Sequence, residues 1–163
     1  MRLGVTGTRY GMTDAQNAAL AGLLMELEAA HGVTEFHHGD CTGVDDQAAD
    51  MVGRLFKVAL IVGHPPTYTS GKSELWRAYN NATHWWLPPR GYLARNREIV
   101  NGVDVVLAVP SHRSEQARGG TWYTVRVARA NGKPLAIVWP NGTVSRERWD
   151  GLAPAGAGEG DTS

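Results

Sequence analysis

Short apolar runs and segments with helical spacing alternate along most of the chain. The apolar runs predict five strands, at residues 2–6, 33–38, 58–62, 103–109 and 134–139. Between them, apolar residues recur every three or four positions, which predicts helices at residues 14–31, 44–55, 91–101 and 121–131. Alternation of this kind builds a mostly parallel sheet with helices on both faces. The pattern therefore predicts a single α/β domain with about five strands.

Boundary signals refine this picture. Thr13 and Gln16 form a capping-box pattern, which predicts that a helix begins there. Residues 63–89 are irregular, with Ser70-Gly71-Lys72, a short helix expected near residues 74–81, and the pair Trp85-Trp86. That stretch is either a functional loop or a packed insertion, and the tryptophans either stack on a base or belong to a core or subunit interface. We expect one domain over residues 1–150 and a disordered tail over residues 151–163.

Composition narrows the class of protein. Lys plus Arg and Asp plus Glu both number 16 in the 163 residues, so the formal net charge is zero. This balance argues against a nonspecific nucleic-acid binder, although it allows a local basic patch. Cys41 is the single cysteine, which excludes an internal disulfide and favours a reducing compartment. With no signal-peptide pattern and no apolar run of membrane-spanning length, we expect a cytoplasmic protein without membrane contact.

In a Rossmann-like sheet, ligands bind at the carboxyl ends of the strands, so the loops there are the candidate sites. After the first strand, Gly7, Thr8 and Arg9 combine close backbone approach with a hydroxyl and a guanidinium that suit a phosphate. The alternative is an ordinary turn with a surface arginine.

The loop after the second strand brackets a polar turn with Gly39 and Gly43. Asp40 could accept a hydrogen bond from a ribose hydroxyl, whereas Asp45 lies where a carboxylate stabilises a helix start. A metal site using His37, His38, Asp40 and Cys41 is not favoured, because the spacing matches no zinc pattern. We expect neither a metal nor a cofactor.

Two further candidate segments flank the predicted strand at residues 103–109, one before it and one after it. Arg95 and Asn96 lie on a predicted helix, where an ion pair between Arg95 and Glu98 is the structural alternative. Gly119, Gly120 and Thr121 open the next helix and predict an anion site at its N-terminus. The chain lacks the dinucleotide fingerprint GxGxxG, the P-loop and the GxSxG elbow, so a conventional dehydrogenase, ATPase or α/β-hydrolase is not supported.

Five motifs together resemble a known family: GVTGTR, HGDCTGVD, RN-x-x-IV, VLAVP and GGTWYTVRVAR-x-x-GKP. In this order, over residues 1–138, they resemble the SLOG superfamily, which includes LOG-type nucleotide phosphoribohydrolases and DprA-like DNA-processing proteins. The small YspA-like branch is the most similar. The resemblance implies a Rossmann-like fold, a nucleotide-like ligand and a homo-oligomer. It implies a pocket formed by Gly7, Arg9, Gly39, Asp40, Gly43, Asp45, Arg95, Asn96, Gly119, Gly120 and Thr121.

One departure separates the chain from the LOG-type hydrolases. Their GG-x-GT-x-x-E motif ends in a glutamate, where this chain has Thr124 or its non-acidic neighbours. We therefore expect a sensor or binding protein for a nucleotide-like, phosphate-bearing ligand. The alternatives are an N-glycosidic hydrolase that uses Asp40 or Asp45 as its catalytic carboxylate, and a DprA-like binder of single-stranded nucleic acid. The last would use the set Arg9, Arg90, Arg95, Arg97, Arg118, Trp85, Trp86 and Tyr92.

Overall fold

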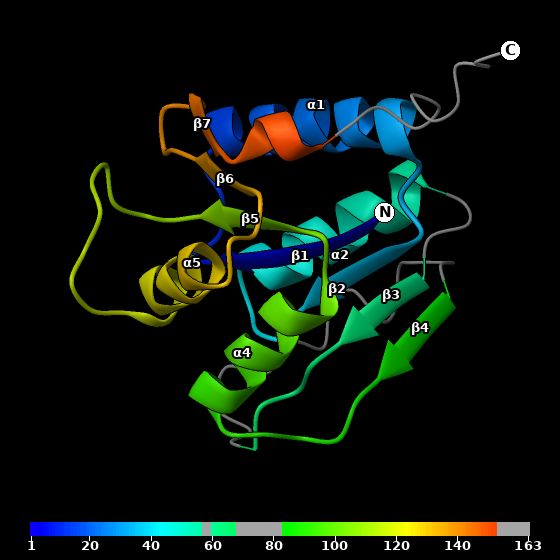
Figure 1. Cartoon of the computed structure of the whole chain (residues 1–163), viewed down its shortest axis with the longest axis vertical. Helices are drawn as coiled ribbons and strands as arrows, with labels where there is room; N and C mark the ends of the chain where they lie inside the picture. The colour runs from blue at the N-terminus through cyan, green and yellow to red at the C-terminus, as the bar shows by residue number, and fades with distance from the viewer. Residues whose placement is uncertain (57–59, 68–82, 153–163) are drawn as a thin grey trace, which may run out of the picture.

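A seven-stranded sheet forms the centre of the protein (Figure 1). The computed structural model describes residues 1–56, 60–67 and 83–152. The strand order is β4-β3-β2-β1-β5-β6-β7, and all neighbours are parallel except β6 and β7. The strands are β1 (Arg2–Gly7), β2 (Glu35–His38), β3 (Leu60–Gly63), β4 (Thr83–Trp86), β5 (Val105–Val109), β6 (Leu135–Val138) and β7 (Val144–Glu147). The α/β class and the mostly parallel sheet are confirmed, but the expected number of about five strands is wrong.

The two strands that the apolar pattern did not predict are the two edges of the sheet. β4 lies within the irregular stretch and pairs with β3 from Thr83 to Trp86. β7 has the sequence VSRE and runs antiparallel to β6. An edge strand has one neighbour and faces water, so it does not need the continuous apolar run of a central parallel strand.

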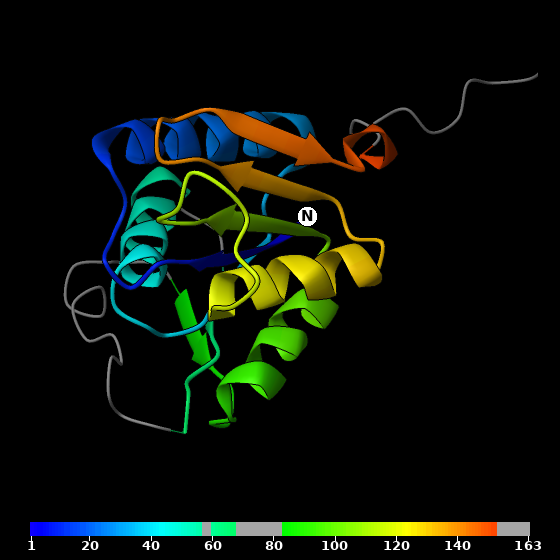
Figure 2. The ribbon, with the colours of Figure 1, turned by 90° about the vertical axis from the view of Figure 1, so that its left-hand side faces the viewer.

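Helices cover both faces of the sheet, as predicted (Figures 1 and 2). One buried cluster packs α1 (Asp14–His31) and α2 (Val44–Leu55) against residues such as Leu3 and Val5. A second cluster packs α4 (Tyr92–Gly102) and α5 (Gly120–Ala130) against Val106 and Ala108 on the opposite face. The last described element is a short 3₁₀ helix, η1 (Trp149–Gly151).

The start of α1 is tied to the carboxyl edge of the sheet. The capping box predicted at Thr13 and Gln16 is confirmed, with both reciprocal hydrogen bonds present. The Gln16 side chain is also buried, and its amide donates to the carbonyl oxygens of Pro110 and Val138. These carbonyls follow or end β5 and β6, so a single side chain holds the helix against two strand ends.

The strand order changes direction between β1 and β5. After β1 the chain adds β2, β3 and β4 on one side of β1, and from β5 onward it adds strands on the other side. β1 pairs with β2 on one side and with β5 on the other. The helix after β1 covers one face and the helix after β5 covers the opposite face. Their connections therefore diverge, which opens a crevice at the carboxyl ends of these two strands.

The remaining sequence predictions concern the irregular stretch, the tail, the tryptophan pair, oligomerisation and membrane contact. Ser70-Gly71-Lys72, the short helix near residues 74–81 and most of the expected tail lie outside the described residues. Trp85 and Trp86 lie on edge strand β4 and are 62% and 38% exposed, so they do not form a core within this chain. A homo-oligomer stays a prediction. No helix in the described ranges combines the length and apolar character needed to cross a membrane.

Candidate functional site

A cavity of about 430 Å³ lies at the carboxyl end of β1, the strand next to β5, where α2, α4 and α5 begin. Its walls include first-turn residues from each of these three helices: Asp45, Tyr92 and Gly120. Free backbone N–H groups and the positive end of the helix dipole favour negative charge at a helix start. Of the twelve predicted ligand-binding residues, eight line this cavity, namely Gly7, Thr8, Arg9, Asp45, Arg95, Asn96, Gly120 and Thr121.

The other four predicted residues lie outside the cavity wall. Asp40 is completely buried, has a positive φ of 53°, and its amide donates to Nδ1 of His38. Gly119 is exposed, directly before α5, with a φ of 105°. Of the two candidate catalytic carboxylates, only Asp45 therefore reaches the cavity.

Gly39 and Gly43 shape the site without lining it. A β-carbon on Gly43 would lie 2.5 Å from the carbonyl oxygen of Thr8, and Gly43 has a φ of +86°. The loops after β1 and β2 can approach this closely only because residue 43 has no side chain. A β-carbon on Gly39 would lie 1.4 Å from Nη1 of Arg95, so Gly39 leaves the space that the guanidinium occupies.

Arg95 is the buried cation of the cavity, with 6% of its surface exposed. Its Nη2 donates a weak hydrogen bond to Sγ of Cys41 at 3.6 Å, and Nη1 lies 3.9 Å from Oδ2 of Asp45. Its Nε has no hydrogen-bond partner among the described residues. A buried guanidinium has five N–H donors to satisfy, and unsatisfied buried donors are costly. Arg95 is therefore positioned to bind an acceptor-rich group in the cavity.

Asp45 is the buried anion of the cavity and the second residue of α2. Its Oδ2 accepts a hydrogen bond from the Cys41 amide at 3.2 Å. Burial raises the pKa of the Asp45 carboxyl to about 6, although Arg95 and the amides of Cys41 and Gly39 act in the opposite direction. The carboxyl can therefore change its protonation state near neutral pH.

The start of α5 is held by side chains on two helices. Asn96 donates from Nδ2 to the carbonyl oxygen of Gly120 at 3.4 Å, and Thr124 donates to the same oxygen at 2.9 Å. Thr124 is 1% exposed and does not line the cavity. The hydroxyl of Thr124 therefore bonds its own helix and does not face the cavity.

The ring of Tyr92 contacts both arginines of the cavity wall. The Tyr92 ring centroid lies 4.9 Å from Cζ of Arg9 and 5.4 Å from Cζ of Arg95, which places both guanidinium groups within cation–π range. Tyr10 is 94% exposed. The predicted ligand-binding set omitted five polar or exposed wall residues: Thr6, Tyr10, Cys41, Tyr92 and Leu93. Of these, Tyr92 was considered only for the binding of single-stranded nucleic acid. The sequence signal that could have identified Tyr92 as a wall residue is its spacing. It precedes Arg95 by three residues, so the two side chains lie on one face of the helix.

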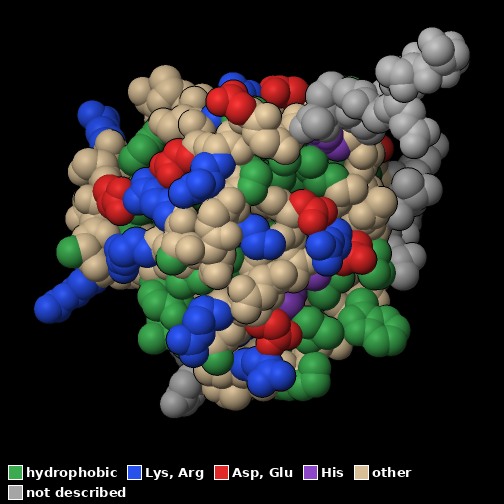
Figure 3. Space-filling model, in the orientation of Figure 1, with side chains coloured by type: hydrophobic (Ala, Val, Ile, Leu, Met, Phe, Trp, Pro, Cys, Tyr) green, Lys and Arg blue, Asp and Glu red, His purple; other side chains and the backbone are tan. Residues whose placement is uncertain are grey.

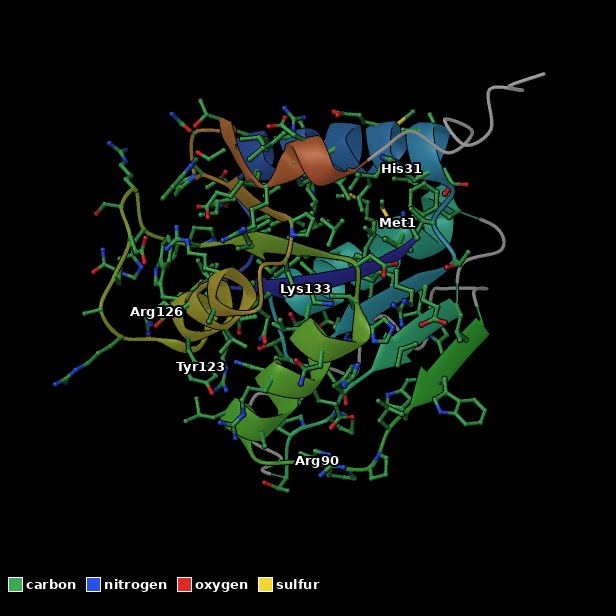
Figure 4. The ribbon with its side chains drawn as sticks, viewed as in Figure 1. Met1, His31, Arg90, Tyr123, Arg126 and Lys133 are labelled. Atoms are coloured by element: carbon green, nitrogen blue, oxygen red, sulfur yellow. The ribbon has the colours of Figure 1, made fainter. Side chains whose placement is uncertain are left out.

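A second group of titratable side chains lies beside α4. His37 contacts Glu35 through Nε2 and His64 through Nδ1, both at 2.9 Å. Nδ1 of His64 lies 3.5 Å from Glu98, which pairs with Arg90 rather than with Arg95 (Arg90 is labelled in Figure 4). Within the described ranges, no three His, Cys, Asp or Glu residues are arranged to hold a metal ion. Burial lowers the pKa of His64 to about 3, with further lowering from His37 and Arg95.

Charges of both signs are interspersed on the face drawn in Figure 3. This distribution agrees with the balanced composition of 16 cationic and 16 anionic side chains. A continuous basic groove is the usual feature of a surface that follows a nucleic-acid backbone. The face in Figure 3 does not have that character.

The fold and its crevice define a Rossmann-like α/β protein. A similar solved structure is the X-ray structure of TM1055, Northeast Structural Genomics Consortium target VT76. The TM-score is 0.53 with 18% sequence identity, covering 82% of this chain and 71% of that chain. At this identity the similarity shows the fold alone. No protein-family model matches the chain, and no curated protein matches it.

Proposed function

We propose that this protein binds a nucleotide or nucleotide-derived, phosphate-bearing ligand in the cavity at β1 and β5, as a sensor or binding protein of SLOG type. The observation that carries the proposal is Arg95, a 94% buried cation whose Nε lacks a hydrogen-bond partner among the described residues. The first turn of α5 offers free backbone N–H groups beside it, at Gly120 and Thr121. Arg9, at the mouth, provides a second guanidinium.

The ribose-binding role first suggested for Asp40 suits Asp45 better. Asp45 lines the cavity and Asp40 does not. A carboxylate accepts hydrogen bonds from hydroxyl groups, whereas it repels a phosphate. We therefore assign the phosphate to Arg95, with Arg9, Gly120 and Thr121 as further donors, and a sugar hydroxyl to Asp45.

The test is binding of nucleoside monophosphates, cyclic nucleotides and ADP-ribose, measured by thermal shift and titration calorimetry. Arg95→Met should weaken binding at least about tenfold, because a charge-assisted contact is lost while the buried volume stays filled. Arg97→Met changes an exposed arginine on the same helix and should bind like the parent protein. Equal binding by the Arg95→Met variant would refute the proposed site.

The second candidate, cleavage of an N-glycosidic bond, depends on Asp45 as the catalytic carboxylate. Its raised pKa, about 6, suits a general acid near neutral pH. The experiment is mass spectrometry of each nucleotide after incubation with the protein. A released free base, lost in Asp45→Asn, would favour the hydrolase, whereas unchanged nucleotide with tight binding would favour the sensor.

The third candidate, a binder of single-stranded nucleic acid, is supported by less of the structure. Arg95 is buried in the cavity and cannot contribute to an open groove, and Arg90 pairs with Glu98. A strongly salt-dependent affinity for oligonucleotides would favour this function instead.

A further inference from the structure

Asp45 and Arg95 are opposite buried charges that meet in the cavity wall without a mutual hydrogen bond. Their closest atoms, Oδ2 and Nη1, are 3.9 Å apart, and both side chains are less than one tenth exposed. Each is held by another contact: Asp45 by the amide of Cys41, and Arg95 by the sulfur of Cys41. Arg95 can therefore accept a ligand without losing a strong bond to Asp45.

A ligand anion at Arg95 would come close to Asp45. A hydrogen bond spans about 2.9 Å, so an oxygen bound to Nη1 would lie within about 7 Å of the Asp45 carboxylate. Two negative charges at this separation repel each other appreciably in a partly buried site. Protonation of Asp45 removes that repulsion.

The charged and polar groups around Asp45 determine its pKa before a ligand binds. Arg95 from α4 favours the charged carboxylate, as do the amides of Cys41 and Gly39, whereas the neighbouring carboxyl of Asp40 opposes it. Arg9, from the loop after β1, shares the cavity wall, as does the thiol of Cys41. Burial outweighs the favourable contacts and leaves the pKa of Asp45 at about 6. Near neutral pH the carboxyl is thus mostly charged but close to protonation.

We propose that Asp45 is the counter-ion of Arg95 in the empty cavity and takes up a proton when an anionic ligand binds to Arg95. The inference rests on the proposed function, because it requires an anion at Arg95. Anion binding and protonation of Asp45 then stabilise each other. Affinity is highest where Asp45 is already protonated, falls as pH rises, and levels off where Asp45 stays charged in both states.

The test uses sulfate as the probe, because its charge does not change over the range from about pH 5 to about pH 8. Titration calorimetry of the full chain should show affinity falling by about tenfold across this range, which corresponds to a ligand-induced rise of about one unit in the pKa of Asp45. Calorimetry in two buffers of different ionisation enthalpy should show proton uptake on binding near neutral pH. This second measurement needs no variant.

Asp45→Asn removes the charge and retains an oxygen that can accept from the Cys41 amide. Its sulfate affinity should vary less than about twofold with pH and should exceed that of the parent protein at the alkaline end. Asp14→Asn, the same change at an exposed position in the first turn of α1, should keep the full pH dependence.

The outcomes separate this inference from the function on which it rests. Sulfate tests the linkage and nucleotides test the binding function, because the phosphate of a nucleotide titrates within this pH range itself. Sulfate binding that is independent of pH, or that keeps its pH dependence in Asp45→Asn, overturns the proton linkage and leaves the binding function standing. Absence of binding by either probe at every pH overturns the binding function, and the linkage with it.

Discussion

The guanidinium of Arg95 occupies the space in which a side chain of residue 39 would lie. A β-carbon on Gly39 would fall 1.4 Å from Nη1 of Arg95 and 2.8 Å from Oδ2 of Asp45. The contact joins the turn after β2 to the first turn and a half of α4, two segments far apart in sequence. The absence of one side chain therefore positions the cation on which the proposed function depends.

Gly39→Ala should displace Arg95 and weaken anion binding. The guanidinium is the far end of a flexible side chain, so it can move away while the fold survives, at a cost of about 1–3 kcal/mol in the free energy of unfolding. Binding of nucleoside monophosphates, measured by calorimetry, should fall at least about tenfold, as in Arg95→Met. Gly22→Ala is the matched control, since no atom lies within 4 Å of its β-carbon. Parent-like affinity in Gly39→Ala would contradict this account.

Gly43→Ala should destabilise the protein more than Gly119→Ala. Both glycines have positive φ angles, of 86° and 105°. At residue 43 the added methyl also meets backbone atoms of Thr8 and Arg9 at 2.5–2.6 Å, whereas residue 119 has open space. We expect a loss of about 1 kcal/mol for Gly119→Ala, from backbone strain alone, and at least about 3 kcal/mol for Gly43→Ala. Urea unfolding measures the loss of stability in both variants. Equal losses would mean that the loop after β2, at Gly43, is not in close contact with the loop after β1.

His64 should make the protein less stable in acid. Its pKa is about 3 in the folded protein and 6.5 in the reference state, so the unfolded chain binds its proton first. This contribution to stability is fully present above about pH 6.5 and is lost as pH falls towards 3. Glu98, 3.5 Å from Nδ1, acts in the opposite direction, so the loss between about pH 7 and about pH 4 is at most about 3 kcal/mol.

The matched variants for this prediction are His64→Gln and His112→Gln. Urea unfolding at both pH values should show a smaller acid-induced loss of stability in His64→Gln than in the parent protein. His112 is exposed, so its replacement should leave that loss unchanged. A parent-like acid response in His64→Gln would show that His64 is not the group responsible.

Local periodicity was enough to predict the central strands and the helices. β5 and β6 are apolar on both faces, and the α1 capping box joins residues only three apart. Such signals depend only on residues close together in the sequence, so they can be recognised without knowing the fold. The edge strands β4 and β7 were missed because their pairing partners, not their own sequences, make them strands.

Local signals also located the loops of the site but not the direction of each side chain. The glycine-rich turns predicted which segments would meet at the carboxyl edge, because parallel strands bring their carboxyl ends to one side of a sheet. Which carboxylate enters the cavity was left open between Asp40 and Asp45, and only Asp45 does. On α4, Arg95 is buried and Arg97 is exposed, although they are only two positions apart.

The sequence by itself therefore determined the class of fold, the start of α1 and the segments that converge on the cavity. Only the tertiary structure decided that Arg95 lies over Gly39, that Asp45 lies 3.9 Å from Arg95, and that Thr124 bonds its own helix. The physical reason is that hydrogen bonding and periodicity within a segment are short-range properties of the chain. Burial, charge pairing and a shared cavity arise from contacts between segments that are distant in sequence and meet only when the sheet forms.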